Sequence, residues 1–216
     1  MMKAHLLPNE NVDYLDDLLL DDKGFLQVVP AAVLSAMPQV HLSIWGNKKG
    51  VYCLPTVELI DWLRKKIAGR SAIEICSGNG AIGRALGIPR TDSYNQTTPQ
   101  MLAYYKLYNQ TPIFPPEDVQ KFEANDAVDH FKPEVVIGSY VTQKYIPSDE
   151  GVVGSSLFGV DELKLVPKVK CYITIGNQSS HGDKRICQRA HKVFNFSWLF
   201  TRTMEPEGNG IYVWGD

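Results

Sequence analysis

An acidic residue and a glycine-rich turn follow one another closely in the first third of the chain. Glu74 lies near the end of a predicted strand, residues 72–76, and comes four residues before Gly78, with Gly80 two residues further on. Glycines permit positive φ and let a ligand approach the backbone closely. A short helix predicted over residues 81–86 would direct its free N–H groups and positive dipole end into the same space. This order of elements is typical of a nucleotide-cofactor site.

The spacing of the acids decides which ligand is favoured. Gly78-x-Gly80-x-x-Gly83 fits the dinucleotide fingerprint, which brings a pyrophosphate to the start of a helix. The carboxylate of Glu74 would repel a pyrophosphate but attract an ammonium group. Asp92 also comes sooner than the position, about 20 residues on, where the fingerprint expects its ribose-binding acid. The pattern favours a ligand with a cationic amino-acid end and a ribose, and leaves an NAD-dependent oxidoreductase as the less favoured alternative.

The segment IEICSGNGAIGRAL resembles motif I of the class I, Rossmann-like S-adenosylmethionine-dependent methyltransferases, with Cys76 in place of the first glycine. The resemblance implies an α/β fold with a doubly wound, mostly parallel seven-stranded sheet, an antiparallel last strand and three α/β/α layers. It also implies that Glu74 holds the amino group of S-adenosyl-L-methionine and that Asp92 binds the ribose hydroxyls. The expected cofactor-binding residues are Glu74, Cys76, Ser77, Gly78, Asn79, Gly80, Asp92, Asp126, Ala127 and Ser139.

Two further segments bear on the adenine and the methyl acceptor. Residues 122–125 are predicted as a short strand, and the resemblance implies that Asp126 and Ala127 after it contact the adenine; the alternative is that Asp126 caps the next helix. Gly-Ser-Tyr-Val ends a strand predicted over residues 134–140, where enzymes that methylate amino groups of DNA bases usually carry Asn/Asp-Pro-Pro-Tyr. That difference weakens a DNA-methylating function. Tyr140 either stacks on a substrate or belongs to the core.

One histidine is a candidate for acid–base chemistry. His181 follows a strand predicted over residues 170–176 and is either a general base or an ordinary loop histidine. With Asp183, Cys187 and His191 it also invites a metal-site interpretation, but zinc sites usually show tighter ligand pairs, so we expect no metal. Because the sulfonium of the cofactor is already activated, a methyltransferase does not require a strong catalytic base.

The remaining elements are predicted from periodicity and turn residues. A hairpin is expected over residues 41–54 and a helix over 56–68, whose apolar positions form one stripe. Further helices are expected over 97–109 and 183–194. Residues 197–204 and 211–215 are expected to pair as a closing antiparallel hairpin. We therefore predict an N-terminal helical and hairpin extension, residues 1–55, followed by a cofactor-binding domain, residues 56–216.

Composition limits the class of protein. The chain has 216 residues, 44% of them hydrophobic, and a net charge of −2 without a long basic run, so the sequence carries no strong nucleic-acid signal. The four cysteines lack metal-site spacing, no leader peptide is expected at the N-terminus, and the longest apolar run is too short to span a bilayer. We expect a cytoplasmic methyltransferase whose acceptor and oligomeric state the sequence leaves open, with a non-catalytic protein that binds the same cofactor as the alternative.

Overall fold

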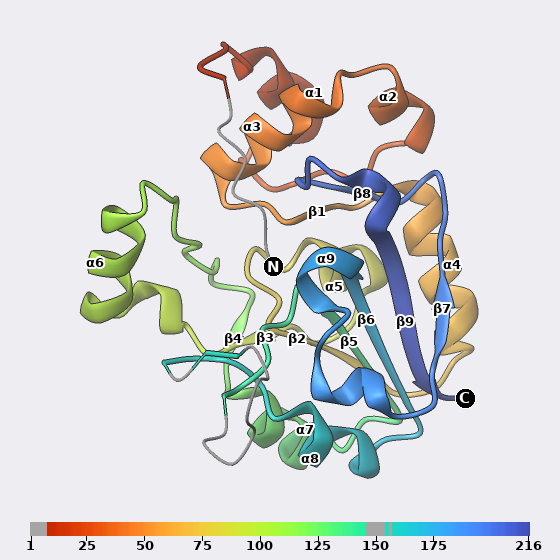
Figure 1. The fold of residues 1–216 in the computed structure, drawn as a ribbon. Coiled ribbons are helices and arrows are strands. Elements are labelled where there is room, and N and C mark those ends of the chain that lie inside the picture. Colours follow the sequence, from red (N-terminus) through yellow and green to blue (C-terminus); the bar gives the residue numbers. More distant parts are fainter. Residues whose placement is uncertain (1–7, 146–153, 156) are drawn as a thin grey trace.

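The computed structural model describes residues 8–145, 154–155 and 157–216 (Figure 1). In chain order its helices are α1 (Asp16–Leu19), α2 (Ala31–Ser35), α3 (Gln39–Lys49), α4 (Val57–Ile67), α5 (Ala81–Leu86), α6 (Pro99–Leu107), α7 (Ala124–Phe131), α8 (Glu162–Leu165) and α9 (Gln178–His181). Its strands are β1 (Cys53–Leu54), β2 (Ala72–Ile75), β3 (Thr91–Asp92), β4 (Gln120–Lys121), β5 (Val135–Ser139), β6 (Cys171–Asn177), β7 (Lys192–Phe194), β8 (Phe200–Thr201) and β9 (Asn209–Gly215).

The main sheet is mixed and contains five strands in the order β2-β5-β6-β9-β7. Strands β2, β5 and β6 run parallel, whereas β9 is antiparallel to both of its neighbours, β6 and β7. The prediction of a doubly wound, mostly parallel seven-stranded sheet is therefore wrong. The fold is mixed α/β, and the predicted strands over residues 134–140 and 170–176 are confirmed as β5 and β6.

Two pairs of short strands explain the difference from the predicted sheet. β3 pairs in parallel with β4, and β1 pairs antiparallel with β8. β3 and β4 have two residues each, and an isolated bridge between Glu74 and Arg90, with a hydrogen bond from the Thr91 hydroxyl to the Glu74 carbonyl, joins this region to β2. The expected closing hairpin of residues 197–204 and 211–215 is also wrong, because β8 pairs with β1 while β9 lies between β6 and β7.

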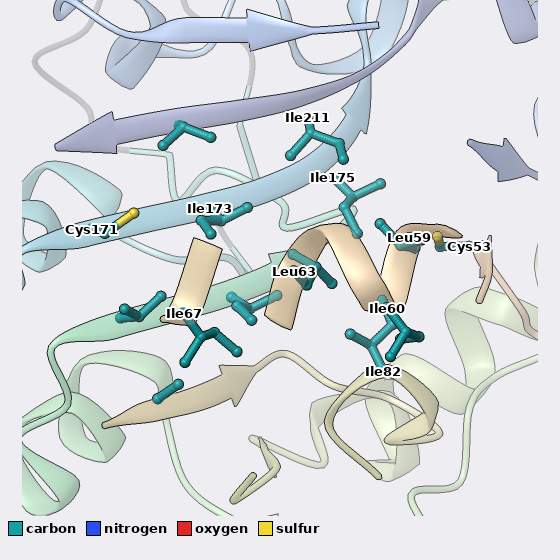
Figure 2. Close-up of a cluster of buried hydrophobic side chains, with 14 of the residues drawn as sticks. Cys53, Leu59, Ile60, Leu63, Ile67, Ile82, Cys171, Ile173, Ile175 and Ile211 are labelled. Atoms are coloured by element: carbon teal, nitrogen blue, oxygen red, sulfur yellow. The ribbon is translucent and has the colours of Figure 1, made fainter. Parts of the chain in front are cut away.

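Apolar side chains cover both faces of the main sheet. Side chains alternate between the two faces along each strand. On one face, Ile173 and Ile175 of β6 and Ile211 of β9 pack against Leu63 and Ile67 of α4 (Figure 2). The opposite face packs against α7 and α8, and its cluster includes Ile73, Ile75, Val136, Tyr172, Tyr212, Trp214, Ala127, Val128 and Leu165. The three parallel strands are thus covered on both faces, and their ends are where a ligand can reach them.

Helix α4 shows how the local sequence specifies one of these covering elements. The Thr56 side chain caps the helix by accepting a hydrogen bond from the Leu59 N–H at 3.1 Å. Leu59, Leu63 and Ile67 lie on the buried side, while basic residues in the last turn complement the helix dipole. The predicted helix over residues 56–68 is confirmed. The helix predicted over 97–109 is confirmed as the shorter α6.

The predicted hairpin over residues 41–54 is wrong, because this segment folds as α3 followed by β1. Gly50 ends α3 in the left-handed conformation, with φ of 68°, and glycine serves a helix end as readily as a hairpin turn. Leu42 and Trp45 are fully buried against α1 and α2, and the Trp45 indole N–H donates to Asp16 Oδ1 at 2.8 Å. Burial of this helix face therefore outweighs the local turn signal.

The N-terminal helices have a core of their own. The buried members of this cluster lie between Val12 and Leu54, and Phe200 of β8 packs against them. In Figure 1, α1, α2 and α3 gather beyond β1 and β8, at the end of the sheet where β6 terminates. The division into residues 1–55 and 56–216 stays a prediction. Among the described helices, none has both the length and the apolar character needed to cross a bilayer.

Two further local predictions are wrong. Residues 183–194 were expected as one helix but form a short 3-10 turn, Arg185–Gln188, and then β7, which pairs with the exposed edge of β9. Residues 122–125 were expected as a strand, yet the strand is β4 and α7 already begins at Ala124. In both places a short segment was assigned to the wrong type of secondary structure. The hydrophobic pattern of such a segment fits a helix and a strand almost equally well, and the contacts with neighbouring elements decide between them.

We expect Leu63→Ala to lower the free energy of unfolding by about 2–5 kcal/mol, because it leaves a cavity between α4 and the sheet. Leu63 is 0% exposed, so neighbouring side chains enclose it on all sides. The matched control is Lys65→Ala, which lies on the exposed side of the same helix. Urea denaturation of both variants checks the result, and equal stabilities would contradict the packing described for α4.

Candidate functional site

The chain turns sharply where β2 ends and α5 begins. Cys76, Gly78 and Gly80 all have positive φ, of 50°, 53° and 69°. The Gly80 N–H donates to the Ser77 carbonyl at 2.8 Å, which closes the turn, and Gly80 then occupies the N-cap position of α5. Left-handed conformations are costly for residues other than glycine, so the strain at Cys76 has to be held in place by its surroundings.

A cleft lies over this turn and is lined by residues from four separate parts of the chain. The residues expected from the sequence that line it are Glu74, Cys76, Ser77, Gly78, Asn79 and Ser139. The residues that sequence reasoning missed are Gly50, Tyr52, Cys53, Ala81, Ile82 and Ile113. The cleft therefore combines the end of β2, the start of α5 and the end of β5 with the segment around β1 and with the loop before β4.

Glu74 is the buried acid of the cleft. It is 2% exposed, and its Oε2 accepts a hydrogen bond from the Gly83 N–H at 2.9 Å. Burial raises its pKa to about 8, against which the Gly83 hydrogen bond and the charges of Arg90 and Arg84 act more weakly. Near neutral pH the carboxyl group consequently holds a proton, and a cation placed beside it would favour the ionised form.

Asp92 adjoins the cleft at the end of β3. Its Oδ2 accepts from the Gly78 N–H and its Oδ1 accepts from the Tyr94 N–H, both at 2.9 Å. Desolvation raises the pKa of Asp92, while these two hydrogen bonds lower it. Asp92 thus holds the glycine turn in place, and the unused lone pairs of its carboxylate are available to hydroxyl groups of a ligand.

Two buried hydroxyl groups in the lining have no partner within the described residues. The Oγ atoms of Ser77 and Ser139 are both inaccessible to solvent and make no hydrogen bond of ordinary geometry there, although Ser139 lies beside the Cys53 thiol and acts to lower its pKa. Ser77 is 9% exposed as a whole residue and follows β2, while Ser139 ends β5. Buried polar groups are normally paired, so each hydroxyl would gain a partner if the lining moved to admit a polar ligand.

The structure does not bring Asp126 and Ala127 to the cleft. Both lie on α7, where Asp126 is exposed and Ala127 is fully buried in the core against the sheet. The predicted strand end that would have presented them to an adenine is absent because Glu123 already occupies the N-cap position of α7. Asp126 lies in the first turn of that helix, where the positive end of the helix dipole stabilises a carboxylate.

Tyr140 and His181 contact one another beside the cleft. Their rings meet edge to face with centroids 5.0 Å apart, and Tyr140 also packs against Tyr52 at 5.5 Å. The Tyr140 hydroxyl donates to Thr201 Oγ1 at 3.0 Å. Burial lowers the pKa of His181 to about 4, assisted by the charge of Lys184. His181 is therefore neutral and weakly basic at pH 7, which makes it a poor general base.

The cysteines in and near the cleft are not nucleophiles. Burial raises the pKa of Cys53 to about 12 and raises that of Cys76 further, so both thiols stay protonated. All four cysteines of the chain are free. The described residues contain no group of three or more His, Cys, Asp or Glu side chains placed to hold a metal ion, and Cys187 instead lies near the His181 carbonyl.

Ile113 is the lining residue for which the sequence offered least signal. It lies in the proline-rich loop before β4, and its side chain covers the glycine turn so closely that a Cβ on Gly78 would lie 3.1 Å from Ile113 Cδ1. Its N–H donates to Gln96 Oε1 at 2.8 Å. Tyr52 and Cys53 were missed for a different reason, since they belong to the segment expected as a hairpin.

Comparison with known proteins adds little to this geometry. No family model and no curated protein matches the chain. Among solved structures, the chain is similar to that of protein 1320 from Thermoplasma acidophilum, with 13% sequence identity and a TM-score of 0.36, over 82% of this chain and 96% of that one. A likeness this distant carries no argument about fold or function, so the functional assignment depends on the chemistry of the cleft.

We expect the stability of the protein to fall between pH 5 and pH 8 because of Glu74. Its pKa is about 8 in the folded protein, above the value of about 4.3 for an unfolded chain. In this window the folded state binds more protons than the unfolded state, so unfolding becomes more favourable as pH rises. In Glu74→Gln, which keeps an acceptor for Gly83, the loss of melting temperature over the same range should be smaller.

Thermal melts at several pH values check this, with the exposed residue Glu207 changed to Gln as the control. Parallel curves for the native protein and Glu74→Gln would contradict a buried, protonated Glu74.

Proposed function

We propose that this protein is an S-adenosylmethionine-dependent methyltransferase that binds its cofactor in the cleft at the end of β2. The observation that carries the proposal is the buried carboxyl group of Glu74, which lines the cleft. Within the described structure it forms no ion pair, because Arg84 and Arg90, whose charges act on it, both bind Asp118 at 2.8 and 3.0 Å.

A buried acid without a cation has two ways to avoid the cost of desolvation. It stays protonated, or a positively charged ligand enters and stabilises the carboxylate. The accessible space in the cleft is about 40 Å³, so a ligand as large as S-adenosylmethionine enters only if the lining moves apart. The amino group of S-adenosylmethionine is a cation of the right kind. The residue type at position 74 therefore supports a ligand with an ammonium group more than one with phosphates.

The rest of the cleft fits parts of the same ligand. Asp92 lies beside the glycine turn with lone pairs for ribose hydroxyls, and Ser77 and Ser139 supply unpaired hydroxyl groups. No adenine contact is assigned, because Asp126 and Ala127 lie elsewhere. The apolar side chain of Ile113 covers the glycine turn and gives the lining an apolar surface against which a flat ring could pack.

The chain itself does not have to supply a strong acid or base. The bound cofactor provides an activated methyl group. The protein's part is to orient the acceptor and exclude water. Tyr52 lines the cleft and packs against Tyr140, which in turn contacts the weakly basic His181.

The dinucleotide alternative is less well supported. The third glycine of the dinucleotide spacing is Gly83, and its contact with Glu74 accounts for the glycine there without a dinucleotide. A Cβ at this position would lie 2.7 Å from Glu74 Oε2. The same carboxyl group would oppose a pyrophosphate when ionised. A non-catalytic protein that binds S-adenosylmethionine or its demethylated product uses the same site residues, so turnover is what separates it from the enzyme.

Calorimetry with S-adenosylhomocysteine should show one site, with NAD as the comparison ligand. In Glu74→Gln, affinity at pH 8 should fall by about 2 kcal/mol or more, roughly 30-fold, because the ligand's ammonium group loses its ion pair. Binding to the native protein at pH 7 should release a proton, seen as a dependence of the heat on the buffer, and the variant should lack this effect.

Glu207→Gln, an exposed acid remote from the cleft lining, is the control and should bind as the native protein does. Unchanged affinity in Glu74→Gln, or tight binding of NAD alone, would overturn the assignment. Incubation with methyl-labelled donor and mass spectrometry of the products then tests turnover, and binding without any labelled product would favour the non-catalytic alternative.

A further inference from the structure

Arg202 follows β8 directly and stacks on Tyr52, which lines the cleft. Its guanidinium carbon is 3.6 Å from the centroid of the Tyr52 ring, and its backbone N–H donates to the Tyr52 carbonyl at 3.0 Å. The stem of Arg202 packs on Gly46 of α3, where an added Cβ would lie 2.7 Å from Arg202 Cβ. The guanidinium is thus held in one place by two elements, α3 and the segment before β1.

The guanidinium has no anionic partner in the described structure. Arg64, Arg84 and Arg90 each pair with an aspartate, whereas no ion pair or side-chain hydrogen bond forms at Arg202 within the described ranges. Stacking on Tyr52 occupies the flat face of the guanidinium and leaves its in-plane N–H groups free. Those donors are arranged as a fork that matches the two oxygens of a carboxylate or phosphate.

Arg202 contacts one tyrosine, Tyr52, and its charge also acts on two others, Tyr105 and Tyr140. Tyr52 lines the cleft and contacts Tyr140, and burial raises the pKa values of Tyr105 and Tyr140, which the positive charge of Arg202 partly offsets. Because the pKa values of Tyr105 and Tyr140 are raised, neither of these two hydroxyl groups supplies a negative charge to Arg202 near pH 7. The result is a positive charge that is stacked on Tyr52 and has no ionic partner among the described residues, next to a cleft that contains the buried acid Glu74.

We propose that Arg202 binds an oxyanion, a carboxylate or a phosphate, on the methyl acceptor, and that Tyr52 separates this subsite from the cofactor cleft. The inference rests on the proposed function, since it assigns a substrate class to the same site. The two ends of the site carry groups of opposite charge. The acid Glu74 selects the cationic amino-acid end of the cofactor, and Arg202 selects an anionic acceptor. A neutral or cationic acceptor would leave the guanidinium unpaired.

The test uses three small probes of similar shape: benzoate, phenyl phosphate and benzyl alcohol. Binding to the full chain is measured by calorimetry with and without saturating S-adenosylhomocysteine. We expect at least one anion to bind about tenfold or more tightly than the neutral alcohol, and the comparison of benzoate with phenyl phosphate tells which oxyanion the site prefers. Equal binding of all three probes would overturn the inference.

Arg202→Gln should reduce anion affinity by about tenfold or more while leaving the affinity for S-adenosylhomocysteine unchanged. The control is Arg64→Gln, an exposed arginine on α4, which should leave both affinities unchanged. If Arg202→Gln does not fold, Arg202→Lys keeps the charge without the fork, and an intermediate loss supports the inference. Native anion affinity in either variant would refute it.

The two proposals fail in different ways. Anion binding that depends on Arg202 but is independent of S-adenosylhomocysteine, in a protein that does not bind that compound, supports the oxyanion subsite and overturns the methyltransferase function. Binding of S-adenosylhomocysteine without selective anion binding supports the cofactor site of the proposed methyltransferase and overturns the oxyanion subsite.

Discussion

The hydrogen bond between the Gly83 N–H and the buried carboxyl group of Glu74 determines much of the site. It joins β2 to the first turn of α5 across 2.9 Å, and it requires a glycine at position 83, since a side chain there would meet the carboxyl oxygen. The same bond keeps the acid inside the protein, where desolvation raises its pKa. One contact therefore shapes the glycine turn and also gives the cleft an acid whose charge depends on what lies beside it.

The backbone departs from ordinary geometry at the carboxyl ends of β2 and β5. Cys76 and Tyr140 both adopt positive φ, and such residues persist only where the surrounding structure holds them, at a cost of about 1–3 kcal/mol each. The two strand ends also carry the buried, unpaired hydroxyls of Ser77 and Ser139. Strain and unpaired polar groups occur together at this edge of the sheet, as expected of a site that binds a ligand.

The sequence predicted those elements whose signals were local and consistent. Helix α4 has a threonine cap, one apolar stripe and basic residues at its end, and the runs that became β5 and β6 are apolar throughout. It failed where one signal has two meanings. Gly50 ends a helix instead of making a hairpin, and residues 183–194 could not be assigned a period without β9 to pair with. The predicted number of strands in the main sheet was wrong for the same reason, because strand pairing depends on which segments are neighbours in space.

By itself the sequence determined the acid, the glycine turn and the start of α5, because these lie within about a dozen consecutive residues and their geometry follows from local chemistry. Only the tertiary structure placed Tyr52 and Ile113 in the cleft lining and Arg202 against Tyr52, and only it removed Asp126 and Ala127 from the site. These residues are tens of positions from the glycine turn. No local propensity relates them to it, since their meeting depends on how α3, β8 and α7 pack around the sheet.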